Sequence, residues 1–383
     1  MARIVVCGYM IRHPLAGNVL AYFHYLLGLH RLGHEVAYLE ESGWANACYN
    51  PATGDYGNDP GPGLRVVRDL LAQHGVEGRA CYVCQETGRV HGADWNDVKT
   101  MLMRADLLLN VGGVCWLPEF RLCRRRALID MDPLFTQIGQ FGAWLLDEHH
   151  VHFSYGANVG RPNCTIPTLG IDWVPTVPPV VLDLWPGPAL PDNGKFTTIA
   201  NWSAYGAVTY EGERYGQKDE EFLRLLDLPT RTAQTLELVL AGVPGSVMQR
   251  LRDAGWSVRG ASETVGTDLS TYRRYICDSR GELSVAKHAY IKTRSGWFSD
   301  RSVCYLAAGR PVIVQDTGFS DWLSTGNGVF TFSSTSEAED CLERVNATYD
   351  VQSHAARETA KKVFAHDVVL RELLSKTLNV VAS

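Results

Sequence analysis

The amino-acid sequence predicts an α/β protein with two Rossmann-like, doubly wound domains that face a central cleft. Two observations lead to this prediction: short apolar runs alternate with helical patterns along the chain, and a proline-rich stretch divides this alternation into two halves. Apolar runs without polar alternation are typical of parallel strands that helices cover on both faces. The length of 383 residues agrees with two domains.

In the first half, most predicted strands are followed by a predicted helix, which is the order of a doubly wound sheet. The strands are expected at 3–9, 34–41, 81–85, 106–111 and 127–130. The helices are expected at 18–32, 64–74 and 97–104. No G-x-G-x-x-G loop and no Walker P-loop occurs, so the sequence supports neither a bound dinucleotide nor cleavage of a nucleoside triphosphate.

Six of the 17 prolines fall between Pro175 and Pro191, which indicates a stiff, extended connector. Beyond it, strands are expected at 196–201, 236–241, 257–259 and 311–315. Helices are expected at 218–226, 246–254, 270–277, 299–309, 336–346, 353–363 and 368–378. We therefore predict one domain over residues 1–180, a second over 181–365, and a terminal helical segment over 366–383.

Charge and hydropathy restrict the class of protein. The formal net charge of -6 and the pI of about 6.1 disfavour a generic polyanion binder, although four arginines from Arg121 to Arg126 form a local basic patch. The N-terminus enters a predicted strand without a signal-peptide pattern. No apolar run approaches the roughly 18 residues that cross a bilayer. We expect a cytoplasmic protein without membrane insertion.

A polar cluster opens the helix that precedes the strand at 311–315. It consists of Ser299, Asp300, Arg301 and Ser302. A helix start offers unpaired backbone N–H groups and the positive end of the helix dipole to an anion, and arginine matches the geometry of phosphate. The alternative is an ordinary N-cap at Ser299 or Asp300, with Arg301 paired to a surface acid.

The loop after the first predicted strand leads into a second helix start, which carries Gly17 and Asn18. His13 lies in this loop, before a proline. A histidine at the mouth of the cleft can accept a proton near neutral pH, as a general base for a hydroxyl nucleophile. A loop histidine bonded to the backbone is the alternative.

Three further features are candidates. Asp130 and Asp132 end a predicted strand on one face and could act as acid and base or hold a cation, but an aspartate before a helix-starting proline is equally an N-cap. Lys218 opens the first helix of the second half and could reach a diphosphate, with a solvent-exposed lysine as the alternative. The histidines between Asp147 and His152 lack H-E-x-x-H spacing, so no metal site is expected.

The segment from Asp300 to Phe319, "DRSVCYLAAGRPVIVQDTGF", resembles GT-B glycosyltransferases of the broad bacterial group related to family 4 and CgeB-like enzymes. The G-R-P-V-I-x-x-D-x-G piece from Gly309 to Gly318 is its most specific part, and the order of elements agrees. The resemblance implies a nucleotide-diphosphate sugar held mainly by the C-terminal domain and an acceptor held mainly by the N-terminal domain. It also implies no cofactor, no obligatory metal, and a terminal helix that crosses back to the first domain.

Carried over to this chain, the resemblance implies roles for individual residues. Gly17 would lie in the glycine-containing loop near the donor phosphates, and Lys218 would match the base that neutralises the diphosphate. Asp316 and Gly318 would lie beside the donor sugar. His13 falls where some members of the fold keep a base.

The sequence departs from family 4 at one motif. Two glutamates with E-x7-E spacing are absent, and Gly296 and Cys304 occupy their positions. Glu282 is then the candidate for the ribose contact. Trp202 and Trp297 are secondary candidates, since aromatic faces stack on bases or sugars, with core packing as the alternative.

The sequence therefore predicts a glycosyltransferase that moves a sugar from a nucleotide-diphosphate sugar to an acceptor hydroxyl. His13 and Asp132 are the catalytic candidates, and Asp130 and Arg125 are the acceptor-side candidates. The expected acceptor is a small molecule or a saccharide, and the basic patch around Arg125 leaves a hydroxylated base in DNA as an option. The alternatives are a sugar-nucleotide 2-epimerase and a non-catalytic sugar-nucleotide-binding protein.

Overall fold

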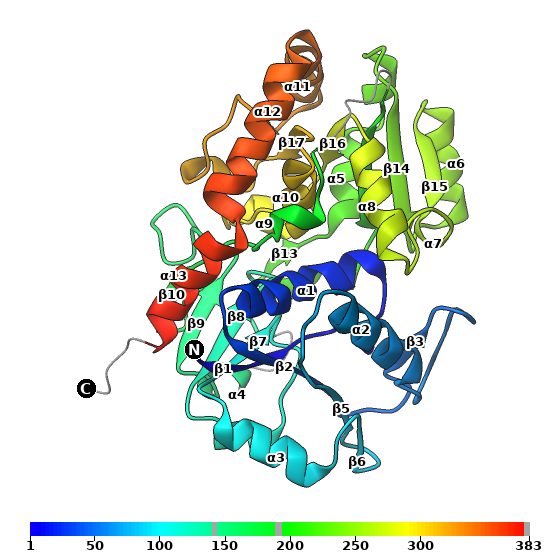
Figure 1. Cartoon of the computed structure of the whole chain (residues 1–383). Coiled ribbons are helices and arrows are strands. Elements are labelled where there is room, and N and C mark those ends of the chain that lie inside the picture. Colours follow the sequence, from blue (N-terminus) through cyan, green and yellow to red (C-terminus); the bar gives the residue numbers. More distant parts are fainter. Residues whose placement is uncertain (140–143, 188–193, 379–383) are drawn as a thin grey trace. The chain divides into compact units, whose positions relative to one another are not determined.

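A computed structural model describes residues 1–139, 144–187 and 194–378 (Figure 1). The chain forms two compact units. The first unit contains Met1–Gly156, Thr168–Val181 and the segment from Ala365 on, and the second contains Ala157–Pro167 and Leu182–Phe364. Residues 188–191 of the predicted connector and 379–383 of the predicted terminal segment lie outside the described residues. None of the described helices is long and apolar enough to cross a membrane.

The described part of the first unit is built on an eight-stranded sheet with the order β10-β9-β8-β7-β1-β2-β5-β6. Its strands are β1 Arg3–Cys7, β2 Glu35–Ser42, β5 Ala80–Cys84, β6 Arg89–His91, β7 Leu107–Val111, β8 Arg126–Asp130, β9 Val151–Ser154 and β10 Trp173–Pro175. All neighbours are parallel except β5 with β6. The strand order reverses between β1 and β7, which is the switch point where doubly wound sheets bind ligands.

Helices cover both faces of this sheet, with α1 and α2 on one face and α3 on the other (Figure 1). The helices are α1 Ala16–Arg31, α2 Gly61–Gln73, α3 Trp95–Arg104, α4 Trp144–Asp147 and α13 His366–Leu378. A hairpin of β3 Cys48–Asn50 and β4 Asp55–Gly57 follows β2. Helix α13 packs on α1 so closely that a Cβ added at Gly28 would lie 2.6 Å from Leu370 Cδ1.

The second unit contains a six-stranded, fully parallel sheet with the order β15-β14-β11-β16-β17-β18 among its described residues. Its strands are β11 Phe196–Asn201, β14 Leu236–Ala241, β15 Ser257–Gly260, β16 Gly281–Ser284, β17 Val312–Gln315 and β18 Val329–Phe332. A separate antiparallel hairpin consists of β12 Val208–Tyr210 and β13 Glu213–Tyr215. Here the strand order reverses between β11 and β16.

The helices of the second unit cover its sheet. They are α5 Lys218–Arg224, α6 Gly245–Asp253, α7 Ala261–Thr264, α8 Leu269–Asp278, α9 His288–Lys292, α10 Asp300–Ala307, α11 Thr335–Ala347 and α12 Tyr349–Thr359, followed by a π-helical turn at Ala360–Phe364. One core cluster joins strand residues such as Leu238 and Ile313 to Phe222 of α5 and Leu342 of α11. Trp202 belongs to this core and stacks on Phe222 at 5.6 Å, so its side chain serves packing. The predicted α/β class with two doubly wound sheets is confirmed.

Candidate functional site

Helix α10 of the second unit begins at a buried polar turn. Ser299 precedes Asp300, the first helical residue, and is 5% exposed, but its side chain makes no capping hydrogen bond. Asp300 Oδ1 accepts a hydrogen bond from the backbone N–H of Arg301 at 2.9 Å. Ser302 is 1% exposed, and its hydroxyl has no hydrogen-bond partner among the described residues. Buried polar groups are normally satisfied, so this hydroxyl marks a place for a ligand atom or water.

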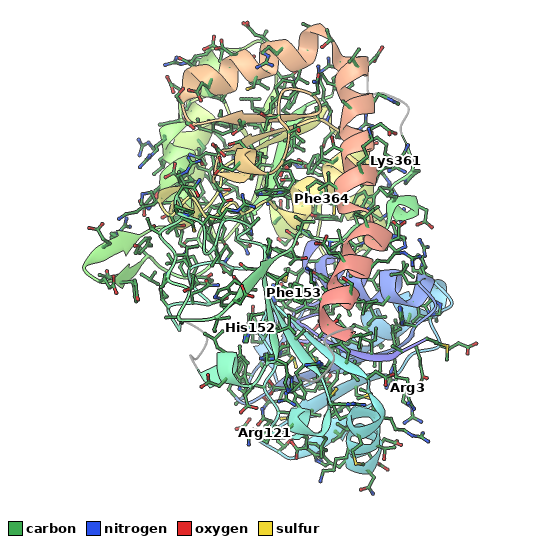
Figure 2. The ribbon with its side chains drawn as sticks, turned by 90° about the vertical axis from the view of Figure 1, so that its left-hand side faces the viewer. Arg3, Arg121, His152, Phe153, Lys361 and Phe364 are labelled. Carbon is green, nitrogen blue, oxygen red and sulfur yellow. The ribbon has the colours of Figure 1, made fainter. Side chains whose placement is uncertain are left out.

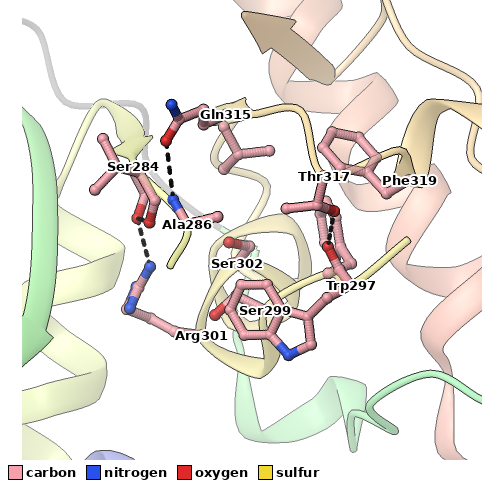
Figure 3. A pocket seen from close by; sticks show the side chains of 12 residues that line it. Ser284, Ala286, Trp297, Ser299, Arg301, Ser302, Gln315, Thr317 and Phe319 are labelled. Carbon is pink, nitrogen blue, oxygen red and sulfur yellow. Dashed lines mark hydrogen bonds between the residues drawn. The ribbon is translucent and has the colours of Figure 1, made fainter. Parts of the chain in front are cut away.

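A small pocket opens onto this turn (Figure 3). Ser284 at the end of β16 and Gln315 at the end of β17 form one side of it. Ser299, Ser302 and the half-buried Trp297 form another. The pocket therefore lies at the carboxyl ends of parallel strands, the edge where open α/β sheets bind ligands.

Arg301 is fixed beside this pocket. Its Nε donates to Glu282 Oε1 at 2.6 Å. Its Nη2 donates to Ser284 Oγ at 2.6 Å (Figure 3). Burial alone would lower the pKa of Arg301, but the Glu282 carboxylate outweighs it and raises this pKa above the ordinary value. Glu282 is 0% exposed and bonded to Arg301, and its Oε2 has no hydrogen-bond partner among the described residues, so its contact with a ribose stays a prediction.

Two lysines add positive charge to the same place. Burial, together with the charges of Arg301 and Lys287, lowers the pKa of Lys218 to about 7. Lys287 is buried, and its Nζ donates to the Tyr205 hydroxyl at 2.7 Å. Cations that depress one another's pKa are stabilised by an anion placed between them. The sequence prediction missed Lys287, which directly precedes α9, a short helix that was not predicted.

The loop after β17 is held in one conformation. Gly318 has φ 87°, and its N–H donates to Asp316 Oδ1 at 2.8 Å. Asn158 Nδ2 donates to the Gly318 carbonyl at 2.9 Å. Thr317 and Phe319, which flank Gly318, line the pocket. The structure thus brings the predicted Asp316–Gly318 loop to the edge of the sheet that also carries the start of α10.

In the first unit, His13 lies among tyrosines in the loop after β1. Its ring stacks on Tyr9 and Tyr56 with ring centres 5.6 and 6.3 Å away, and it meets Tyr49 at 5.3 Å. His13 Nδ1 is 3.4 Å from the Tyr56 hydroxyl. Burial lowers the pKa of His13, so the ring is neutral at pH 7 and able to accept a proton.

Polar contacts hold the loop that carries His13. Asn18 Nδ2, in the first turn of α1, donates to the carbonyls of Tyr9 at 2.5 Å and His13 at 2.8 Å. Gly17 is half-buried in the same turn. The buried Glu40 carboxylate accepts from the backbone N–H of Arg12 at 2.7 Å. Asn18 therefore orients this loop through hydrogen bonds from its side chain to two backbone carbonyls of the loop.

Asp130 and Asp132 have different environments. Asp130 is fully buried and accepts hydrogen bonds from Ser154, Gln137, Thr136 and the backbone N–H of Asp132, at 2.6 to 2.9 Å. Burial raises the pKa of Asp130, although these four donors act to lower it. Asp130 therefore ties the loop after β8 together. Asp132 is half-buried in that loop. The loops that carry Asp132 and His13 follow strands that are not neighbours, because β7 lies between β8 and β1.

The basic patch lies at the start of β8. Arg121 projects from the outside of the first unit and donates through Nε to Glu148 at 3.0 Å (Figure 2). Arg126 Nε donates to the Glu148 carbonyl at 2.6 Å, and Arg125 directly precedes the strand. Because β8, β7 and β1 are parallel, Arg125 lies at the opposite edge of the sheet from His13. The structure does not bring these two candidates together.

No protein-family model and no curated protein matches the chain. Among solved structures, it is similar to an α-glucosyltransferase in complex with UDP-glucose and DNA containing an abasic site, with 9% identity, a TM-score of 0.60, and coverage of 98% of this chain and 99% of that chain. It is also similar to Anabaena Alr3699/HepE in complex with UDP and glucose, with 12% identity, a TM-score of 0.60 and 100% of both chains. The chain is also similar to sucrose-phosphate synthase from Thermosynechococcus elongatus, with 12% identity, a TM-score of 0.52 and coverage of 97% of both chains. The chain has the GT-B fold of these structures.

Proposed function

We propose that this protein is a glycosyltransferase of the bacterial group related to family 4 and CgeB-like enzymes, acting in the cytoplasm on a nucleotide-diphosphate sugar. The observation that carries the proposal is the group of Lys218, Lys287 and Arg301 near the start of α10. The shared fold with proteins that hold UDP or UDP-glucose supports it. Because cations and helix N–H groups can stabilise a diphosphate leaving group, the reaction needs no metal.

In this reaction, the acceptor oxygen bonds to the anomeric carbon of the donor while the bond from that carbon to the diphosphate breaks. The negative charge on the departing diphosphate is stabilised by Lys218, Lys287 and the first turn of α10. The proton of the acceptor hydroxyl passes to the neutral ring of His13. Asp316 and Gly318 are assigned to the donor sugar. We place the donor in the domain over residues 181–365 and the acceptor in the domain over 1–180.

A thermal-shift panel of UDP, GDP, dTDP and ADP sugars tests the donor site, since a ligand that binds the native state raises its melting temperature. We expect a shift with at least one nucleotide sugar, and its loss in Lys218→Met and Lys287→Met. Lys361→Met is the matched control, because Lys361 pairs with Glu358 on the surface of the same unit. A panel without any shift would overturn the proposal.

Two alternatives are separated by product analysis. The three solved structures named above are an α-glucosyltransferase, Anabaena Alr3699/HepE and a sucrose-phosphate synthase, so the 2-epimerase alternative gains no support from them. A transferase releases the nucleoside diphosphate only when an acceptor is added, whereas an epimerase needs no acceptor. A non-catalytic binding protein would leave the nucleotide sugar intact in both cases.

A further inference from the structure

A group of aromatic side chains lies at one edge of the first unit, in loops and a hairpin that follow β1, β2 and β7. This aromatic platform consists of Tyr9, His13, Trp44, Tyr49, Tyr56 and Trp116. The three strands are parallel neighbours in the order β7-β1-β2, so these segments leave the sheet at the same edge. That edge includes the switch point of the sheet, where doubly wound folds bind ligands.

The platform is continuous because Arg12 joins its two parts. The Arg12 guanidinium lies 4.6 Å from the ring centre of Tyr9 and 5.2 Å from that of Trp44. Trp44 in turn lies 6.1 Å from Trp116. Arg12 is buried and bonded to Glu40 at 3.0 Å, so it supports the rings from within the protein.

Two of these rings are strongly exposed. Trp44 is 45% exposed and Tyr56 is 54% exposed, while Tyr9, Tyr49 and Trp116 are half-buried. A cluster of aromatic rings with two strongly exposed members, at the edge where doubly wound sheets bind ligands, is typical of a binding surface. Each ring is held by a neighbouring ring or by Arg12, so a ligand would meet a preformed surface at small entropic cost.

The charge of the platform identifies the chemistry of its ligand. The segments 8–15, 43–60 and 112–118, which carry the platform, contain no lysine, and their single arginine is the buried Arg12. Their acidic residues, Asp55 and Asp59, are exposed. These segments themselves carry no exposed cation of the kind that binds a polyanion such as DNA. A neutral ring with polar groups at its rim suits both the aromatic faces and the exposed amides of Asn46 and Asn58.

We propose that the aromatic platform binds the acceptor of the transfer reaction and that this acceptor is a saccharide whose ring stacks on Trp44 and Tyr56. The acceptor role rests on the proposed function, whereas saccharide binding does not. His13 lies within the platform, so a hydroxyl of the bound ring meets the neutral imidazole that takes its proton. Arg125, at the opposite edge of the sheet, has no part in acceptor binding, whereas Arg121 and Arg126 line one pocket with Trp116.

Saturation-transfer NMR on the full chain without nucleotide tests the proposal. The probes are the methyl glycosides of glucose, galactose, mannose and N-acetylglucosamine, with maltose and cellobiose. We expect saturation of the ring protons of at least one probe, and an affinity about tenfold lower in Trp44→Ala and in Tyr56→Ala. Trp44→Phe and Tyr56→Phe keep a ring and should retain most of the binding. Met103→Ala, which removes an exposed side chain from α3, should bind as the wild type does.

The outcomes distinguish failure of the aromatic platform from failure of the proposed glycosyltransferase function. Saturation of none of these saccharides, or equal binding in the alanine variants, overturns the platform. Binding of a hydroxymethylated DNA duplex in place of saccharides, lost in Trp44→Ala, also overturns it. Because Trp44 and Tyr56 lie outside the donor site, the melting shift with nucleotide sugars should survive both alanine changes. Saccharide binding without any nucleotide-sugar shift would leave the platform standing and remove the proposed function.

Discussion

Arg301 Nε lies 2.6 Å from Glu282 Oε1, with the arginine 11% exposed and the glutamate 0% exposed. The two charges compensate each other inside the second unit, so this arginine is a fixed hydrogen-bond donor more than a free positive charge. Lys218 and Lys287 add further positive charge near the start of α10, where the Asp300 carboxylate also acts on Lys218. A diphosphate bound there would be neutralised by the lysines and oriented by the arginine.

Breaking this pair should destabilise the protein. Glu282→Gln leaves the buried Arg301 charge without its counterion, and such changes cost about 3–5 kcal/mol of unfolding free energy. The double variant Glu282→Gln/Arg301→Gln should recover part of this loss, because no buried charge is then left alone. Urea unfolding of the single and double variants measures both effects, and strictly additive losses would contradict the coupling.

The affinity for UDP-glucose should fall as the pH rises from about 6 to about 8.5. Lys218 has a pKa of about 7 in the absence of ligand, so above this pH it loses the proton whose charge attracts the diphosphate. The fall should approach about tenfold per pH unit above the pKa, since one linked proton is taken up on binding. Calorimetric titration at several pH values measures it. Lys218→Arg should flatten the dependence, because a guanidinium stays protonated; the same slope in both proteins would refute the role of Lys218.

Removing the imidazole of His13 should lower turnover about 10²–10⁴-fold while the binding of nucleotide sugar is unchanged. Because burial lowers the pKa of His13, the ring of the native protein stays neutral at a lower pH than an ordinary histidine does. Activity should therefore persist below the usual histidine range and be lost on further acidification, as the base becomes protonated. Initial rates across the acid range show this limb. The exposed His354 provides the matched control, His354→Ala.

Gly318→Ala should destabilise the second unit. The glycine has φ 87°, a left-handed conformation that costs other residues about 1–2 kcal/mol, and the added Cβ would lie 2.9 Å from Asn158 Nδ2. Gly206→Ala is the control, since nothing lies within 4 Å of its Cβ position and its φ is not positive. Equal denaturation midpoints for the two variants would show that the loop after β17 tolerates a side chain.

The sequence predicts the six-residue strands of the second unit and the four-residue strands β15 and β17, but it misses other short strands. The expected strands at 196–201 and 236–241 coincide with β11 and β14, which have six residues each. Strand β16 was not predicted: it has four residues, begins with Gly281 and contains Glu282, and tertiary contacts hold it in the sheet. Lys287 follows this strand, so its position near the donor site was missed with it.

Site residues that act through one local segment could be predicted, whereas those assembled by the sheet could not. The polar cluster at the start of α10 was visible because four neighbours share one helix turn. Trp44, Tyr56 and Trp116 come together only because β2 and β7 flank β1, an order that no spacing in the sequence encodes. Arg125 could have been excluded from the site by sequence alone. A residue that precedes a parallel strand lies at the amino edge of the sheet, opposite the edge that binds ligands.

Helix α13 begins at His366, after the whole of the second unit, yet it covers α1 at Gly28. During translation, α1 leaves the ribosome long before the helix that shields its apolar stripe. The first unit therefore completes its folding last, and a nascent chain that stalls within the second unit exposes this stripe to chaperones or to aggregation.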